Sequence, residues 1–119
     1  MSVRLRLDDT PALSQAESLA RAGYSTGASQ RNRASYADAV VLPQGVEGWR
    51  RRLLTDPQTS GGLLVACDAA AAPALCARIR QRGDAQACIV GGVESRAPLV
   101  TVEHAAVASA RWRREWESN

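Results

Sequence analysis

The continuous apolar run LLVAC at residues 63–67 constrains the fold more than any other stretch of this 119-residue chain. A run without polar alternation is typical of a strand that is buried on both faces. Asp68 can cap a helix over residues 69–82, Gly83 can end that helix, and residues 87–93 have the composition of a further strand. Because a strand-helix-strand unit packs its helix against one face of a sheet, we predict a sheet covered by helices.

Other segments extend this predicted sheet. VRLRL at residues 3–7 alternates apolar and polar side chains, as a half-buried strand does. Residues 39–42 predict a short strand, and residues 99–102 predict a strand that follows residues 87–93 through a hairpin turn at 94–98. The predicted fold class is therefore α+β, with a mixed sheet and helices packed on its faces.

Apolar residues at helical spacing predict further helices over residues 13–22 and 46–54. A last helix is predicted for residues 104–116, where its tryptophans would dock on the core or on a second copy rather than form a ligand cage. Residues 24–38 are polar and show no clear period. We predict a long loop there, which is either functional or mobile.

Composition excludes several classes of function. The chain has 15 basic and 12 acidic residues, a net charge of +3 that is too small to indicate a nucleic-acid partner. All the basic residues are arginines, so no mechanism that needs a lysine ammonium can be carried by this chain alone. No apolar run approaches the length of a membrane span, and the start of the chain does not resemble a signal peptide.

Cys67, Cys76 and Cys88 are an odd number of cysteines, and no two have CxxC spacing. Each lies among apolar neighbours, which predicts buried, reduced thiols in a cytoplasmic protein. A reactive thiol is the alternative, but no histidine or basic cluster adjacent in sequence would lower a thiol pKa.

The remaining charged residues predict surface features rather than sites. His104 is the only histidine, and without clustered ligands it predicts a satisfied or exposed side chain, with no metal site. Asp8 and Asp9 follow a predicted strand and precede a proline, and they predict a solvated turn more than a metal site. The arginines at 50–52 predict a solvated helix face more than a nucleic-acid patch.

The segment TDPQTSGG at residues 55–62 is the most informative for function. Asp56 and Pro57 fix a turn, and the hydroxyls and glycines that follow let the backbone approach another surface closely. Such a loop can present N–H groups and hydroxyls to an anion. It is not a P-loop, because it precedes a strand and lacks the lysine. From the pattern alone a structural turn is the default, with anion binding as the alternative.

Two motifs carry a resemblance to a known family. DPQTSGGLLVA at residues 56–66 resembles the signature of the carboxy-terminal domain of selenide, water dikinases, also called selenophosphate synthetases, and TGASQRNRASY at residues 26–36 is similar to a second family pattern. The resemblance covers residues 3–102. Arg33 departs from the usual aromatic residue and Ala37 from the usual glycine, which puts the packing of that loop in doubt.

The resemblance implies a fold and a division into parts. It implies a carboxy-terminal domain of the aminoimidazole ribonucleotide synthetase type, partly ferredoxin-like and truncated at its start. Residues 1–102 would be this incomplete domain, and residues 103–119 would be an extra helix beyond the usual family end.

The resemblance also implies a reaction, in which ATP, selenide and water give selenophosphate, AMP and phosphate with the help of magnesium. The chain would form one wall of the ATP/phosphate cleft. The residues implied to line or brace this cofactor-binding cleft are Thr59, Ser60, Gly61, Gly62, Arg31 and Asn32. No catalytic residue and no metal ligand is assigned to this chain.

The family's catalytic cysteine or selenocysteine, its lysine and its glycine-rich segments belong to an amino-terminal ATP-binding domain, which would be the partner. The chain alone is therefore expected to be inactive and not to bind ATP or magnesium tightly. The alternative is a stand-alone binding or dimerisation module, in which the tryptophan-bearing tail at 103–119 forms a homodimer interface.

Overall fold

The computed structural model describes residues 1–58 and 60–104. The helices and strands of these residues are, in chain order, β1 (Ser2–Arg6), η1 (Leu7–Asp9), α1 (Ser14–Arg21), α2 (Gly27–Tyr36), η2 (Ala37–Ala39), β2 (Val40–Val41), α3 (Gly48–Leu54), α4 (Ala72–Gln81), β3 (Gly91–Glu94) and β4 (Val100–Glu103). The predicted α+β class is confirmed. The predicted final helix lies outside the described residues.

The four strands form one mixed sheet in the order β2-β4-β1-β3. β1 pairs in parallel with β4 and antiparallel with β3, so that Val3 is opposite both Val100 and Val93. The predicted hairpin at 94–98 is wrong, because β1 lies between the two strands that it would have joined. The backbone of β1 bonds both neighbours just beyond the paired residues: Val3 N donates to Leu99 O at 2.9 Å and Arg6 N to Val90 O at 2.8 Å.

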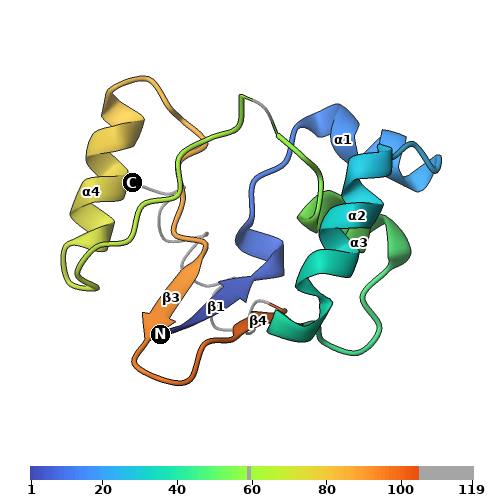
Figure 1. Ribbon diagram of the computed structural model, residues 1–119. Coiled ribbons are helices and arrows are strands. Elements are labelled where there is room, and N and C mark those ends of the chain that lie inside the picture. The colour runs from blue at the N-terminus through green and yellow to red at the C-terminus, as the bar shows by residue number, and fades with distance from the viewer. Residues whose placement is uncertain (59, 105–119) are drawn as a thin grey trace.

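Three helices gather on one side of the sheet and α4 lies on the other (Figure 1). The predicted helices at 13–22 and 46–54 are confirmed as α1 and α3. The core beneath them is small: Leu7, Val46 and Val102 are buried together, with partly buried leucines and Val40 around them. Trp49 of α3 is buried too, and the Arg21 guanidinium lies 4.3 Å from its ring centre.

The predicted polar loop at 24–38 is wrong, since most of it forms α2. Thr26 caps this helix, and its Oγ1 accepts a hydrogen bond from the Ser29 N–H at 3.2 Å. Ser29 is the one buried residue of α2. A helix with so little buried surface has no apolar stripe, so hydrophobic periodicity could not reveal it.

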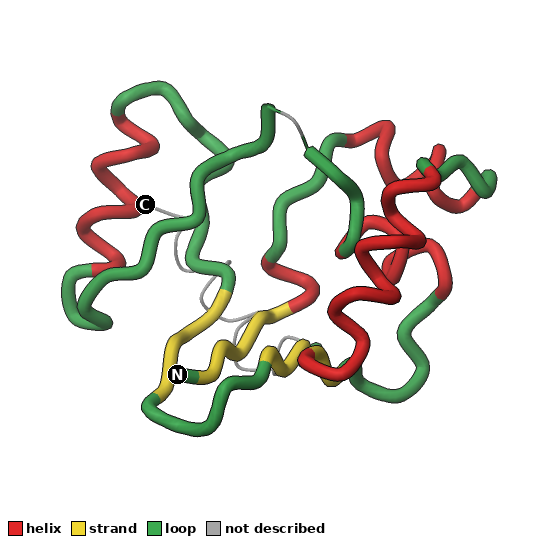
Figure 2. The backbone as a smooth tube through the Cα atoms, in the orientation of Figure 1, coloured by secondary structure: helices red, strands yellow, loops and turns green. Residues whose placement is uncertain are grey.

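The predicted buried strand at 63–67 is also wrong. The segment is extended but pairs with no strand of the described chain, as the long loop in Figure 2 shows. Leu63 is 96% exposed, Leu64 79% and Val65 56%. A strand that is apolar on both faces must be covered on both faces, and the described residues do not cover this segment.

The helix predicted at 69–82 and the strand predicted at 87–93 are shorter than predicted. Asp68 organises a turn in which its Oδ1 accepts from the Ala70 N–H at 2.8 Å, and α4 begins only at Ala72.

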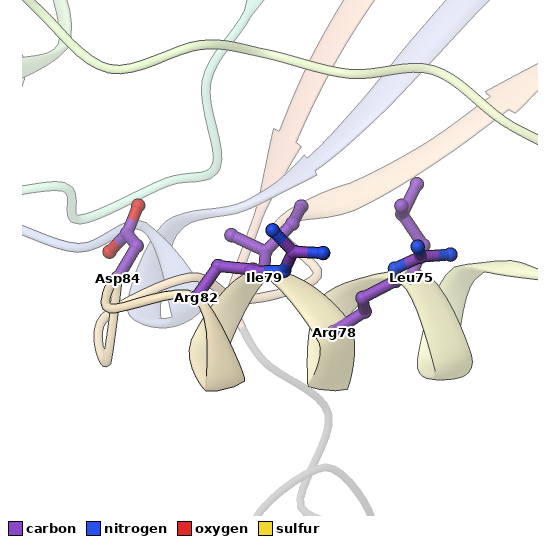
Figure 3. A pocket seen from close by; sticks show the side chains of 5 residues that line it. All are labelled: Leu75, Arg78, Ile79, Arg82 and Asp84. Carbon is purple, nitrogen blue, oxygen red and sulfur yellow. The ribbon is translucent and has the colours of Figure 1, made fainter.

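Leu75 and Ile79 of α4 line an open pocket of about 440 Å³ (Figure 3). No helix of the described chain has the length and apolar character that crossing a bilayer requires.

Candidate functional site

The base of the loop that follows α3 is fixed to α2 by side-chain hydrogen bonds. Asn32 Nδ2 donates to Thr55 O at 3.1 Å, and Ser29 Oγ donates to Asp56 Oδ1 at 3.4 Å. The Asp56 N–H also donates to Leu53 O at 3.2 Å, which continues the last turn of α3. The loop therefore leaves the helical layer from a defined position.

The tip of this loop faces solvent. Ser60, Gly61 and Gly62 are exposed, whereas Thr59 lies outside the described residues. A Cβ on Gly61 would lie 2.8 Å from Oε1 of Gln58, so the Gln58 side chain folds over the glycine. The bend is thus open to an approaching group and is not packed inside the protein.

The predicted site residues are only partly brought together. Asn32 is half-buried and braces the base of the loop, whereas Arg31 is exposed on α2, with its guanidinium beside Gly27. Within the described chain, no hydrogen bond or ion pair joins Arg31 or Asn32 to the exposed Ser60–Gly62 bend.

Sequence analysis missed a polar pocket of about 300 Å³ between the three helices. We call it the arginine pocket, and its lining residues are Gly23, Ser25, Ser29, Gln30, Arg33, Arg51, Arg52 and Thr55. The signal that could have revealed it was the run of arginines after Trp49, together with Arg33. Both were assigned to other roles, because a sequence does not show which helices face one another.

The predicted solvated face at 50–52 is wrong, since all three arginines are half-buried and bonded. Arg50 Nη1 donates to Asp8 Oδ1 at 2.6 Å, Arg51 Nε to Val46 O at 3.0 Å and Arg52 Nη2 to Ala20 O at 2.7 Å. These bonds attach α3 to η1, to the preceding loop and to α1.

Within the described residues, the carboxylates and the histidine do not gather into a metal-ligand cluster. Asp8 and Asp9 are half-buried in η1 and paired with arginines, so the predicted solvated turn is wrong. The His104 side chain is about half exposed, and its Nδ1 lies 3.7 Å from Asp8 Oδ2. Residues 1–58 and 60–104 contain no group of three or more side chains of the metal-ligating types.

The three cysteines are free thiols, as predicted, but Cys67 is exposed rather than buried. Cys76 and Cys88 are half-buried, and Cys88 Sγ donates to Asp9 O at 3.2 Å. Burial raises the pKa of the Cys88 thiol above its ordinary value, with a smaller contribution from Cys76. This thiol is therefore a poor nucleophile.

The chain is similar to curated proteins named selenide, water dikinase. The relative from Rhizobium meliloti is 51% identical over 102 residues, which are 86% of this chain and 29% of the relative. The relative from Paraburkholderia xenovorans is 43% identical over 80% of this chain, and that from Pseudomonas straminea is 40% identical over 86%. A search with protein-family models gave no match.

This α+β chain aligns in sequence with only part of each relative, so it is a homologue of one segment of a larger dikinase. The chain is homologous to part of the selenide, water dikinases, and it spans less than a third of the length of these relatives. The resemblance found in the two sequence motifs is thereby confirmed. The aminoimidazole ribonucleotide synthetase type and the boundary at residue 102 stay predictions.

Proposed function

We propose that this chain forms one wall of the ATP/phosphate cleft of a selenophosphate synthetase and is not catalytic alone. The reaction would convert ATP, selenide and water to selenophosphate, AMP and phosphate. The observation that carries the proposal is the open bend at Ser60–Gly62, which is anchored at its base by Asn32 and Ser29. A bend of this kind presents hydroxyl and N–H donors to a phosphate on another surface.

The proposed partner is an amino-terminal ATP-binding domain. Leu63, Leu64 and Val65 follow the bend directly and expose an apolar surface of the kind that a domain interface covers. Docking there would bring the bend to the edge of the shared cleft. Arg31 would contribute a charged fork from α2, which suits a polyphosphate.

ATP and magnesium would be held mainly by the partner domain. Magnesium prefers carboxylate and phosphate oxygens, and the described residues hold no three-ligand cluster. They therefore do not fit the metal by themselves. We place the assembled enzyme in the cytoplasm, where free cysteines such as these persist.

A chimera tests the proposal. This chain replaces the homologous segment of the Rhizobium meliloti selenide, water dikinase, and selenide-dependent AMP formation is measured. We expect the chimera to turn over and the chain alone to be inactive. Ser60→Ala in the chimera should lower kcat about tenfold, as the loss of a donor to a charged group does.

Ser95→Ala is the matched control, because Ser95 is an exposed serine in the turn between β3 and β4. It should leave kcat unchanged. Turnover by the purified chain without a partner would contradict the assignment of the chemistry to the other domain. Equal effects of the two serine variants would contradict the role of the bend.

The second candidate is a stand-alone binding or dimerisation module. The exposed apolar segment at Leu63–Val65 favours it, since a second copy could cover this surface as well as a partner domain could. The tail at 103–119 is a further proposed part of such an interface. Light scattering of the chain with and without the tail measures its contribution to the mass in solution.

A further inference from the structure

We propose that the arginine pocket binds a tetrahedral oxyanion of the phosphate class. The pocket lies between the end of α1, the first turn of α2 and the last turn of α3. Its volume of about 300 Å³ is at the lower end for small-molecule sites, which suits a phosphate or a phosphomonoester. The inference stands independently of the selenophosphate synthetase proposal.

The charge of the pocket is positive and unbalanced. Arg33, Arg51 and Arg52 line it, and no acidic side chain of residues 1–58 and 60–104 does. Among the described residues, Arg6, Arg21 and Arg50 have carboxylate partners, but no ion pair joins the three pocket arginines to a carboxylate. Positive charges gathered in a concavity focus the electrostatic field there and raise the local concentration of anions.

Two of the guanidinium groups are already held in place. Arg51 uses Nε to bond Val46 O, and Arg52 uses one Nη2 hydrogen to bond Ala20 O. No further side-chain hydrogen bond of either arginine is found in the described chain, and Arg52 Nε is buried there without a partner. Groups fixed before binding lose little freedom when the ligand arrives. The planar fork of arginine also matches phosphate oxygens better than an ammonium does.

The remaining lining residues add neutral donors. Ser25, Gln30 and Thr55 contribute polar side chains, and Ser29 belongs to the first turn of α2. The amino-terminal end of a helix carries partial positive charge, which favours an anion further. Asp56 is the neighbouring carboxylate, but it accepts from Ser29 Oγ at 3.4 Å and is not part of the lining.

A purely structural role explains less of the pocket. Arginines near the carboxyl end of a helix can bond its last carbonyls, as Arg52 does at Ala20 of α1. This role accounts for one donor group of Arg52. It does not account for Arg33, which comes from α2, is exposed and makes no hydrogen bond within the described chain.

The test is an NMR titration of the full ¹⁵N-labelled chain with sodium phosphate, at constant ionic strength maintained with sodium chloride. We expect saturable shifts centred on the amides of Ser25, Ser29 and Gln30 and on the side-chain Nε–H of Arg52. Arg33→Gln should weaken phosphate binding about tenfold, as the loss of one charged hydrogen bond does. Because Arg33 is exposed, this variant keeps the fold even where Arg52→Gln does not.

Arg96→Gln is the matched control, since it removes the same charge from an exposed arginine between β3 and β4. It should leave the phosphate affinity unchanged. Parallel titrations with AMP and ATP distinguish the source: tighter binding at the same signals assigns a nucleotide phosphate, and equal or weaker binding assigns free phosphate. Shifts that chloride reproduces, no saturable shift at the pocket, or equal weakening by Arg33→Gln and Arg96→Gln would overturn the proposal.

Discussion

At the scale of single residues, arginine pairs fix the end of β1. Arg6 Nε lies 2.6 Å from Asp9 Oδ2, and Arg50 Nη1 lies 2.6 Å from Asp8 Oδ1. Partly exposed ion pairs contribute at most about 1 kcal/mol each, so their value is positional more than energetic. They set the direction in which the chain leaves the sheet for α1.

Glu47 links the helices through several partners. The neighbouring Trp49 indole lowers its pKa, and Arg21 lowers it further. The pKa of Arg21 is raised, first by its hydrogen bond to Glu17 and then by Glu47. A lowered carboxyl pKa gives stability that is present at neutral pH and lost as the pH falls through the folded value.

The cysteines should differ in their reactivity. Alkylation with iodoacetamide at mildly alkaline pH should modify Cys67 before Cys88, because Cys67 is exposed and the pKa of the Cys88 thiol is raised by burial. Since the folded pKa of Cys88 is raised, its contribution to stability is present at neutral pH and lost as the pH rises above the ordinary thiol range.

Mass spectrometry of the alkylated peptides measures this order. Alkylation in urea is the control, because unfolding removes the difference in burial and should bring the two rates together. Faster modification of Cys88 than of Cys67 in the folded chain would contradict the burial of Cys88.

At the scale of elements, the strand pairing of β1 depends on a glycine in β3. Gly91 pairs with Leu5, and a Cβ at Gly91 would collide with the carbonyl oxygen of Arg4. Gly91→Ala should therefore lower the free energy of unfolding by about 1–3 kcal/mol, as overpacking does, measured by urea denaturation. Gly92→Ala is the control, because its Cβ would meet no atom within 4 Å. Equal stability of both variants would contradict the close approach of β1 and β3.

The predictable elements were those with a strong apolar period. The strand at 3–7 and the helices α1 and α3 follow from local spacing, and the sequence predicts them correctly. α2 was not predicted, because Thr26, Ser29 and Asn32 stabilise it through hydrogen bonds rather than through an apolar stripe. The segment at 63–67 was assigned to the sheet because its apolar composition indicates that it should be buried. Composition does not show whether the chain provides a surface that covers it.

The candidate site was also predictable only in part, because a sequence shows local features but not how helices pack. The bend at Ser60–Gly62 was visible as a run of glycines and hydroxyls, since turn chemistry is local. The arginine pocket was not, because Arg33 and Arg52 come from different helices and meet only through the packing of α2 and α3. Its residues became recognisable once the helices were placed.

At the scale of the whole molecule, a small core is accompanied by a large uncovered surface. The apolar segment at Leu63–Val65 should make the isolated chain self-associate, with a mass that rises with concentration in light scattering. Leu64→Glu should shift the mass toward the monomer, because burying the new charge at a contact costs several kcal/mol. Leu13→Glu is the control at an exposed leucine of another region. A concentration-independent monomer for the unaltered chain would contradict the expectation.

The position of β1 has a consequence for biosynthesis. β1 precedes the other described elements in the chain, yet its two neighbours, β3 and β4, come from residues 91–103. Pairing at such sequence separation is slow, and the ribosome must release Glu103 before β4 can join. α1 and α3 can meet while translation continues, whereas the sheet closes only after β4 has emerged. The nascent chain thus carries β1 unpaired while the residues between β1 and β3 are made, the interval in which chaperones would matter most.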